Sequence, residues 1–159
     1  MSSVRQPIKV MFVCMGNICR SPMAEAVFAH LVRQEGLAAF FEIASSAVGS
    51  WHLGQRPHSG TLTVLKQKNI PVNPQKISTL LTSQDFKRYD YVFSLDREVV
   101  NNIQYLYAVP TKRLLEYAPG ATTLDVPDPY YDHSFNRAYD LVLQGCKGLL
   151  AHIREKENI

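Results

Sequence analysis

Residues 8–26 read IKVMFVCMGNICRSPMAEA, and this stretch decides the fold. Residues 8–13 form a nearly continuous apolar run, the pattern of a strand that is covered on both faces. Pro22 stands where the first turn of a helix tolerates proline, with Ser21 as its expected N-cap, and apolar residues then recur at helical spacing until Gly36. A strand, a short loop and a helix open a βαβ unit, so we expect the first strand to be central and parallel.

The rest of the chain continues this alternation. Further strands are expected over residues 40–45 and 90–95, a weaker one over 112–116, and helices over 59–69, 82–88, 96–106 and from 132 or 134 to 157. The pattern predicts an α/β fold: one domain over residues 1–159, a doubly wound sheet of about four parallel strands, and helices on both faces. Residues 1–6 are expected to be a flexible extension. Ligands bind such sheets beyond the carboxyl ends of the strands, where the loop after the first strand lies.

Composition excludes several classes of protein. The chain has 159 residues, 46% of them hydrophobic, which is enough for one core without a metal or disulfide staple. Its net charge of +3 is small for a protein that binds nucleic acid, although the first half favours an anion. No apolar run approaches the roughly 18 residues of a membrane span. The 3 cysteines have no disulfide-framework spacing and no zinc-site partners. We therefore expect a cytoplasmic protein that uses no metal and no cofactor.

The loop after the first strand carries the chemistry. Cys14 is followed by five residues and then by Arg20 and Ser21 at the start of a helix. This geometry turns successive backbone N–H groups toward one point and adds the positive end of a helix dipole, an arrangement that binds a phosphate. The expected phosphate-binding residues are Met15, Gly16, Asn17, Ile18, Cys19, Arg20 and Ser21. Arg20 can hold two phosphate oxygens, and the same field favours the thiolate of Cys14, which makes it the candidate nucleophile.

The other two cysteines have different expected roles. Cys19 lies five residues from Cys14 in the same loop, so it is either a packing residue or a reversible redox partner of Cys14. Cys146 falls on the last predicted helix, where a buried packing role is expected.

Two motifs carry a resemblance to a known family. Residues 13–26 are similar to the signature of the low-molecular-weight protein-tyrosine phosphatases, and Asp128-Pro129-Tyr130-Tyr131 resembles their second motif. The two motifs occur in the right order, and moderate similarity extends from about residue 8 to residue 153. The resemblance implies a metal-independent phosphatase that forms a phosphocysteine intermediate. Its substrate would be a phosphotyrosine-containing protein or an aryl phosphate, its product inorganic phosphate, and its state a monomer or weak dimer.

The same resemblance assigns the remaining roles in the reaction. Asp128, stiffened by a proline on each side, would be the general acid and then the general base, because the leaving phenolate needs a proton. Asp125 and Asp132 are rival acids that do not match the motif. The hydroxyl of Ser21 would donate a hydrogen bond to the thiolate of Cys14.

Support of the loop is where the chain departs from the family. Asn17 resembles the residue that holds the strained loop through side-chain hydrogen bonds, with Ser45 or Ser46 as its partner. Many relatives place a histidine after the Ile-Pro step, whereas this chain reads Ile70-Pro71-Val72-Asn73-Pro74. Either Asn73 substitutes for the histidine or that buttress is missing.

The substrate pocket and the rival functions follow from a few further residues. Trp51, Tyr130 and Tyr131 are the expected walls of a phosphotyrosine slot, together with Met15 and Ile18. The related arginine phosphatases have a threonine where Ile18 stands, so isoleucine favours an aryl phosphate. An arsenate reductase on the same fold needs two further cysteines near the middle of the chain, and residues 80–95 contain none. A non-catalytic phosphate-binding module would need neither Cys14 nor Asp128.

Overall fold

Residues 5–159, which the computed structural model describes, form one sheet of four parallel strands in the order β2-β1-β3-β4. The strands are β1 (Ile8–Cys14), β2 (Phe41–Ala47), β3 (Tyr91–Ser94) and β4 (Lys112–Arg113). β1 pairs with β2 on one side and with β3 on the other. The predicted parallel α/β sheet with a central first strand is therefore confirmed.

The apolar run of β1 is explained by burial on both faces of the sheet. Val10, Phe12 and Cys14 belong to one hydrophobic cluster, and Met11 and Val13 to a second one. Successive side chains of a strand point to opposite faces, so the two clusters lie on the two sides of the sheet. A strand in this position must be apolar at almost every residue.

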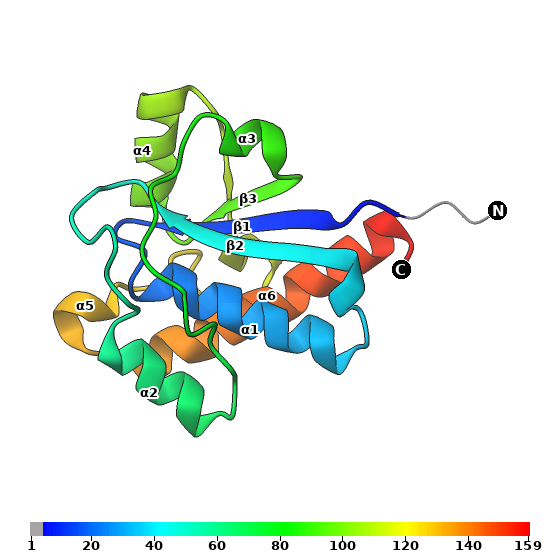
Figure 1. Cartoon of the computed structure of the whole chain (residues 1–159), viewed down its shortest axis with the longest axis horizontal. Coiled ribbons are helices and arrows are strands. Elements are labelled where there is room, and N and C mark those ends of the chain that lie inside the picture. Colours follow the sequence, from blue (N-terminus) through cyan, green and yellow to red (C-terminus); the bar gives the residue numbers. More distant parts are fainter. Residues whose placement is uncertain (1–4) are drawn as a thin grey trace.

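Helices cover both faces of the sheet. α1 (Arg20–Gln34), α2 (Ser59–Gln67) and α6 (Phe135–Glu157) lie on one side, and α3 (Asp85–Arg88) and α4 (Arg97–Tyr107) lie on the other (Figure 1). Two 3-10 turns, η1 (Ala38–Phe40) and η2 (Leu114–Tyr117), connect these elements. The short helix α5 (Pro129–Asp132) lies near the end of the sheet at which β1 ends (Figure 1). The carboxyl ends of the strands and the second motif thus meet on one side of the molecule.

The long helix α6 supplies a large share of the core. Its buried residues recur at helical spacing and include Ala138, Leu141, Val142, Gly145, Leu149 and Ile153. The helix starts after Ser134, so the later of the two predicted starts is the right one.

The predicted N-cap of the first helix is wrong. Cys19 occupies the N-cap position, and Ser21 lies inside the first turn of α1. The hydroxyl of Ser21 is 3.0 Å from Cys14 Sγ, so the side chain faces the end of β1 and caps no backbone N–H. A serine before a proline at the start of a helix has the sequence pattern of an N-cap. Here the contact with Cys14, which the sequence does not show, gives its hydroxyl another partner.

The predicted strand over residues 112–116 is also largely wrong. Only Lys112 and Arg113 pair with β3, and the chain then turns into η2. Leu114 and Leu115 are adjacent and both fully buried, which an alternating strand with one covered face does not allow. The carboxylate of Glu116 accepts a hydrogen bond from the backbone N–H of Arg113 and closes the turn. The predicted helix over 82–88 is likewise shorter, since it begins at Asp85, but it ends at Arg88 as expected.

The N-terminal segment was predicted to be flexible over residues 1–6, and residues 1–4 lie outside the described part of the chain. Arg5 is exposed, and its guanidinium donates a hydrogen bond to the backbone carbonyl of Glu157 at 2.9 Å. None of the helices within residues 5–159 has the length and apolar character needed to cross a membrane.

The contact between α6 and η2 provides a test of the packing. A Cβ added to Gly148 would lie 1.8 Å from the backbone oxygen of Tyr117, and backbone cannot move aside cheaply. Helix propensity favours Gly148→Ala by up to about 1 kcal/mol, but overpacking costs about 1 to 3 kcal/mol. We expect a net loss of about 2 kcal/mol in the free energy of unfolding, measured by urea denaturation. The exposed neighbour Lys147→Ala should change stability by less than about 0.5 kcal/mol, and a stabilised Gly148→Ala variant would contradict the packing.

Candidate active site

The loop between β1 and α1 curls around the sulfur of Cys14. The backbone N–H of Asn17 donates to Cys14 Sγ at 3.3 Å, and Asn17 has a left-handed backbone with φ of 56°. Asparagine tolerates this conformation better than most residues. Gly16 lies against the ring of His52, where an added Cβ would be 2.7 Å from the ring carbon Cδ2. The sequence of the loop therefore fits a backbone wrapped tightly around one atom.

A buried hydrogen-bond network supports this loop from behind. The side-chain N–H₂ of Asn17 donates to Ser21 Oγ at 2.7 Å and to Ser45 Oγ at 2.9 Å. Asn17, Ser21 and Ser45 are each no more than 2% exposed. Because Ser21 Oγ accepts from Asn17, its own proton is free to point at Cys14 Sγ. The contacts expected between Ser21 and Cys14 and between Asn17 and Ser45 are thus both present.

Ser46, the alternative partner of Asn17, does not make that contact. Its hydroxyl donates to Met11 Sδ at 3.2 Å on the opposite face of the sheet. Ser45 and Ser46 are neighbours on β2, so their side chains point to opposite faces, and only one of them can reach the loop.

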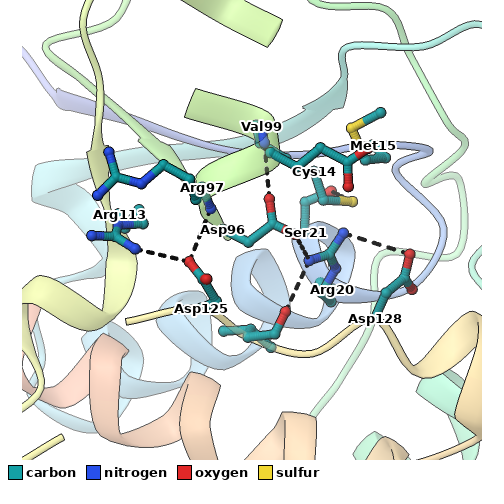
Figure 2. Close-up of polar contacts among 12 residues, drawn as sticks. Cys14, Met15, Arg20, Ser21, Asp96, Arg97, Val99, Arg113, Asp125 and Asp128 are labelled. Atoms are coloured by element: carbon teal, nitrogen blue, oxygen red, sulfur yellow. Dashed lines mark hydrogen bonds and ion pairs between the residues drawn. The ribbon is translucent and has the colours of Figure 1, made fainter. Parts of the chain in front are cut away.

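Arg20 is a buried cation held between two carboxylates. Its Nη1 donates to Asp96 Oδ2 at 2.5 Å and to the backbone oxygen of Val126 at 2.9 Å, while Nη2 lies 3.6 Å from Asp128 Oδ2 (Figure 2). Its side chain is only 2% exposed. Burial alone would lower the pKa of Arg20, but the charges of Cys14, Asp96 and Asp128 outweigh it and raise that pKa. The guanidinium is therefore permanently charged and fixed in orientation.

These groups open into a cavity of about 470 Å³. It is lined by residues 14–20 of the loop and by Trp51, His52, Glu98, Asp128, Tyr130 and Tyr131. All five predicted wall residues line it, and Trp51 and Tyr131 are 66% and 80% exposed at its mouth. Of the predicted phosphate-binding residues only Ser21 is absent from the lining, since it lies beneath the loop. Glu98, in the first turn of α4, was not predicted, because a helix-start glutamate carries no signal of a pocket in the sequence.

Among the three candidate acids, only Asp128 faces this cavity. Its Oδ1 accepts from the backbone N–H of Tyr130, and its side chain is 28% exposed. Asp125 is paired with Arg113 at 3.0 Å and lies on the far side of Arg20 (Figure 2). Asp132 accepts two hydrogen bonds from Ser134, and these lower its pKa, so it is a poor proton donor.

The cysteines form neither a disulfide nor a metal site. Cys14, Cys19 and Cys146 are all buried free thiols, and within residues 5–159 no group of three or more metal-ligating side chains occurs. Burial, followed by the charges of Cys14 and Asp128, raises the pKa of Cys19 to about 12. Burial alone raises the pKa of Cys146. The redox partnership of Cys19 with Cys14 stays a prediction, and Cys146 has the packing position that was expected for it.

The expectation that Asn73 substitutes for the missing histidine is wrong. Asn73 accepts through its side chain from the backbone N–H of Gln75 and is exposed, so it does not reach the loop. Instead the ammonium of Lys76 lies 3.0 Å from Asn17 Oδ1. This segment therefore supports Asn17 through a lysine. A lysine in a polar, proline-containing segment usually extends into solvent, so no pattern in the sequence selects this one.

Comparison of sequences points to one family. The family model described as low molecular weight phosphotyrosine protein phosphatase matches residues 9–158. The chain is 36% identical over 156 residues to the low molecular weight protein-tyrosine-phosphatase YfkJ of Bacillus subtilis, covering 96% of this chain and 99% of YfkJ. It is 37% identical over 155 residues to the low molecular weight protein-tyrosine-phosphatase PtpA of Staphylococcus aureus, covering 96% of this chain and 97% of PtpA.

Comparison of structures finds YfkJ again, together with a second phosphatase. The crystal structure of YfkJ from Bacillus subtilis matches with a TM-score of 0.89 at 37% identity, over 95% of this chain and 97% of that one. A Drosophila arginine phosphatase matches with a TM-score of 0.82 at 32% identity, over 92% of this chain and 98% of that one.

The ion pair between Arg20 and Asp96 can be tested by its effect on stability. Asp96 caps α4 through Oδ1, which accepts from Val99 N, and holds Arg20 through Oδ2. Asp96→Asn retains a good N-cap but removes the partner charge of a buried guanidinium. We expect a loss of about 3 kcal/mol in the free energy of unfolding, measured by chemical denaturation without phosphate. Asp140→Asn, on the exposed side of α6, is the matched control, and an equal small effect of both changes would refute the role given to the pair.

Proposed function

The chain belongs to the low molecular weight phosphotyrosine protein phosphatase family and is a protein-tyrosine phosphatase, and from this premise we propose that it acts through a phosphocysteine intermediate on Cys14. One observation carries the proposal: the cavity brings together the sulfur of Cys14, the guanidinium of Arg20 and the carboxyl group of Asp128. These are a nucleophile, a clamp for phosphate oxygens and a proton donor for a leaving group.

The first step transfers the phosphoryl group to sulfur. The thiolate of Cys14 attacks phosphorus in line with the ester bond, the S–P bond forms and the P–O bond to the phenol breaks. Asp128 gives its proton to the departing phenolate oxygen. Arg20 and the backbone N–H groups of the loop stabilise the charge on the equatorial oxygens, and they are in place before the substrate arrives.

The second step returns the enzyme to its starting state. The carboxylate of Asp128 takes a proton from water, the water oxygen attacks phosphorus, and the S–P bond breaks. Inorganic phosphate leaves and the electron pair remains on Cys14. The proton of Ser21, 3.0 Å from the sulfur, stabilises the thiolate as leaving group. Every group needed for both steps lies at the end of β1, on the loop that follows it, on α1 or at the N-cap of α5.

The walls of the cavity favour an aromatic phosphate ester. Trp51, Tyr130 and Tyr131 stand at its mouth, and Tyr130 packs beside His52 with ring centroids 5.5 Å apart. Ile18 is 6% exposed and contributes an apolar side chain to the lining. A flat ring can be held between such groups while the phosphate reaches the base of the loop. We therefore propose phosphotyrosine in proteins as the substrate and the cytoplasm as the setting of the reaction.

A second candidate is hydrolysis of phosphoarginine. The match to the Drosophila arginine phosphatase favours it as the alternative, since that protein shares the fold at 32% identity. A phosphoarginine carries a polar guanidinium in place of the ring. The apolar Ile18 offers that group no hydrogen bond, whereas the resemblance led us to expect threonine at this position in arginine phosphatases.

A substrate panel separates these candidates. Wild-type protein is assayed with phosphotyrosine, phosphoserine and phosphoarginine peptides, with p-nitrophenyl phosphate, and with arsenate plus a thiol reductant. We expect rapid hydrolysis of phosphotyrosine and p-nitrophenyl phosphate only, unchanged by a metal chelator. Cys14→Ser should abolish turnover and still bind phosphate, because the cradle of N–H groups and Arg20 remains. Retained activity of this variant, inhibition by the chelator, or a preference for phosphoarginine would overturn the proposal.

The acid role of Asp128 is tested by varying the leaving group. Asp128→Ala should lower kcat by about 100-fold or more with a poor leaving group such as phenol, and much less with p-nitrophenol, which leaves without a proton. The activity of the wild type should be greatest on the acid side of neutrality, since Cys14 must be ionised while Asp128 carries its proton. Asp132→Ala is the matched control and should leave both rates near those of the wild type. An equal loss with both leaving groups would remove Asp128 from the acid role.

A further inference from the structure

The ammonium of Lys76 is buried behind the phosphate-binding loop. It donates to Asn17 Oδ1 at 3.0 Å and to the backbone oxygen of Ser45 at 2.9 Å, and it lies 3.7 Å from Glu25 Oε1. The lysine side chain is only 11% exposed. Lysine is rarely buried without partners, and here the ammonium has two hydrogen-bond acceptors and one carboxylate as ion-pair partner. The ammonium lies outside the substrate cavity, so it can affect the reaction only through other groups.

Lys76 fixes which way the side-chain amide of Asn17 points. Asn17 Oδ1 accepts from Lys76 and, at 3.1 Å, from the backbone N–H of Thr79. If the amide of Asn17 were rotated by 180°, its N–H₂ group would face the ammonium of Lys76 and the N–H of Thr79. These donors would then have no acceptor on Asn17. The N–H₂ of Asn17 is therefore directed toward Ser21 and Ser45.

The orientation of Asn17 in turn sets the proton of Ser21. Ser21 Oγ accepts from Asn17 at 2.7 Å, so the single hydroxyl proton is left for Cys14 Sγ at 3.0 Å. A directed chain of donors thus runs from Lys76 through Asn17 and Ser21 to the sulfur. Each bond in it polarises the next, which strengthens the final hydrogen bond to a thiolate.

Charge acts in the same direction as the hydrogen bonds. Burial lowers the pKa of Lys76, while the carboxylate of Glu25 and the sulfur of Cys14 act to raise it, so cation and thiolate stabilise one another. Glu25, on α1, also accepts from Ser45 Oγ at 2.6 Å. Arg33, further along α1, lines the same side cavity as Lys76 and Glu25. The charged groups that act on the ammonium are therefore Glu25 and Cys14, and the guanidinium of Arg56 donates to the backbone oxygen of Lys76 at 2.6 Å.

We propose that Lys76 is a positioning residue for the nucleophile: by orienting Asn17, it directs the proton of Ser21 onto Cys14 and favours the thiolate. The inference rests on the proposed function only in taking Cys14 as the reacting group. It predicts that removal of the ammonium changes the ionisation of Cys14 even though Lys76 does not touch the substrate.

The test compares Lys76→Met with the wild type by the pH dependence of Cys14 alkylation with iodoacetamide. The alkylated residue is identified by peptide mass spectrometry, and the midpoint is the pH at which the rate is half its maximum. We expect the midpoint to rise by about 1 pH unit, because the donor chain and a buried positive charge are both lost. On p-nitrophenyl phosphate, kcat/KM below the midpoint should then fall by up to about tenfold. Lys87→Met, an exposed lysine on α3, is the matched control and should leave the midpoint unchanged.

A second variant separates the donor from generic loosening of the loop. Lys76→Gln supplies an N–H₂ donor without the charge, so its midpoint should fall between those of the wild type and Lys76→Met. If Lys76→Met does not unfold cooperatively, it is not a folded variant, and the proposal is then tested by the alkylation midpoint of Lys76→Gln against that of the wild type. A midpoint within about 0.2 units of the wild type in a folded variant overturns the proposal. Alkylation of Cys14 does not require turnover. A wild-type protein inactive on phosphotyrosine would therefore refute the proposed function, while the alkylation midpoints would still test the role of Lys76.

Discussion

The buried amide of Asn17 is the interaction on which the site depends. An asparagine side chain can donate two hydrogen bonds and accept two, and Asn17 uses all four, with Ser21 and Ser45 as acceptors and Lys76 and Thr79 as donors. These partners come from α1, β2 and the segment after α2. The left-handed backbone of Asn17 is costly alone, and the four bonds offset that cost. The same left-handed backbone directs the N–H of Asn17 at Cys14 Sγ. The conformation that strains the loop therefore also positions the nucleophile.

Sequence reasoning succeeded where a residue's role depends on its neighbours in the chain. β1 is apolar at nearly every position because it is central, and a central strand of a parallel sheet leaves few alternatives. The loop that follows such a strand must lie at the carboxyl edge of the sheet, so the amino-acid pattern alone places Cys14 and Arg20 there. Asp128 could be found only through the resemblance, because an aspartate between two prolines is also an ordinary turn residue.

Sequence reasoning failed where a role is created by contacts between distant segments. Ser21 has the spacing of an N-cap, and its hydroxyl is redirected by Cys14, seven residues earlier. Leu114 was expected to extend the strand of Lys112 and Arg113, yet it packs against Gly145 of α6 and begins the turn η2. Lys76 reaches Asn17 across 59 positions of sequence. Charged residues in loops are usually solvated, so only the geometry distinguishes this lysine from the others.

In the proposed mechanism, one arrangement of charges serves two opposite steps. Asp96 and the carbonyl of Val126 hold Nη1 of Arg20, whereas Nη2 lies 3.6 Å from Asp128, beyond hydrogen-bond distance. That side of the guanidinium is therefore free for phosphate oxygens. In the proposed mechanism Asp128 gives its proton to the leaving group in the first step, which leaves the carboxylate that the second step needs as its base.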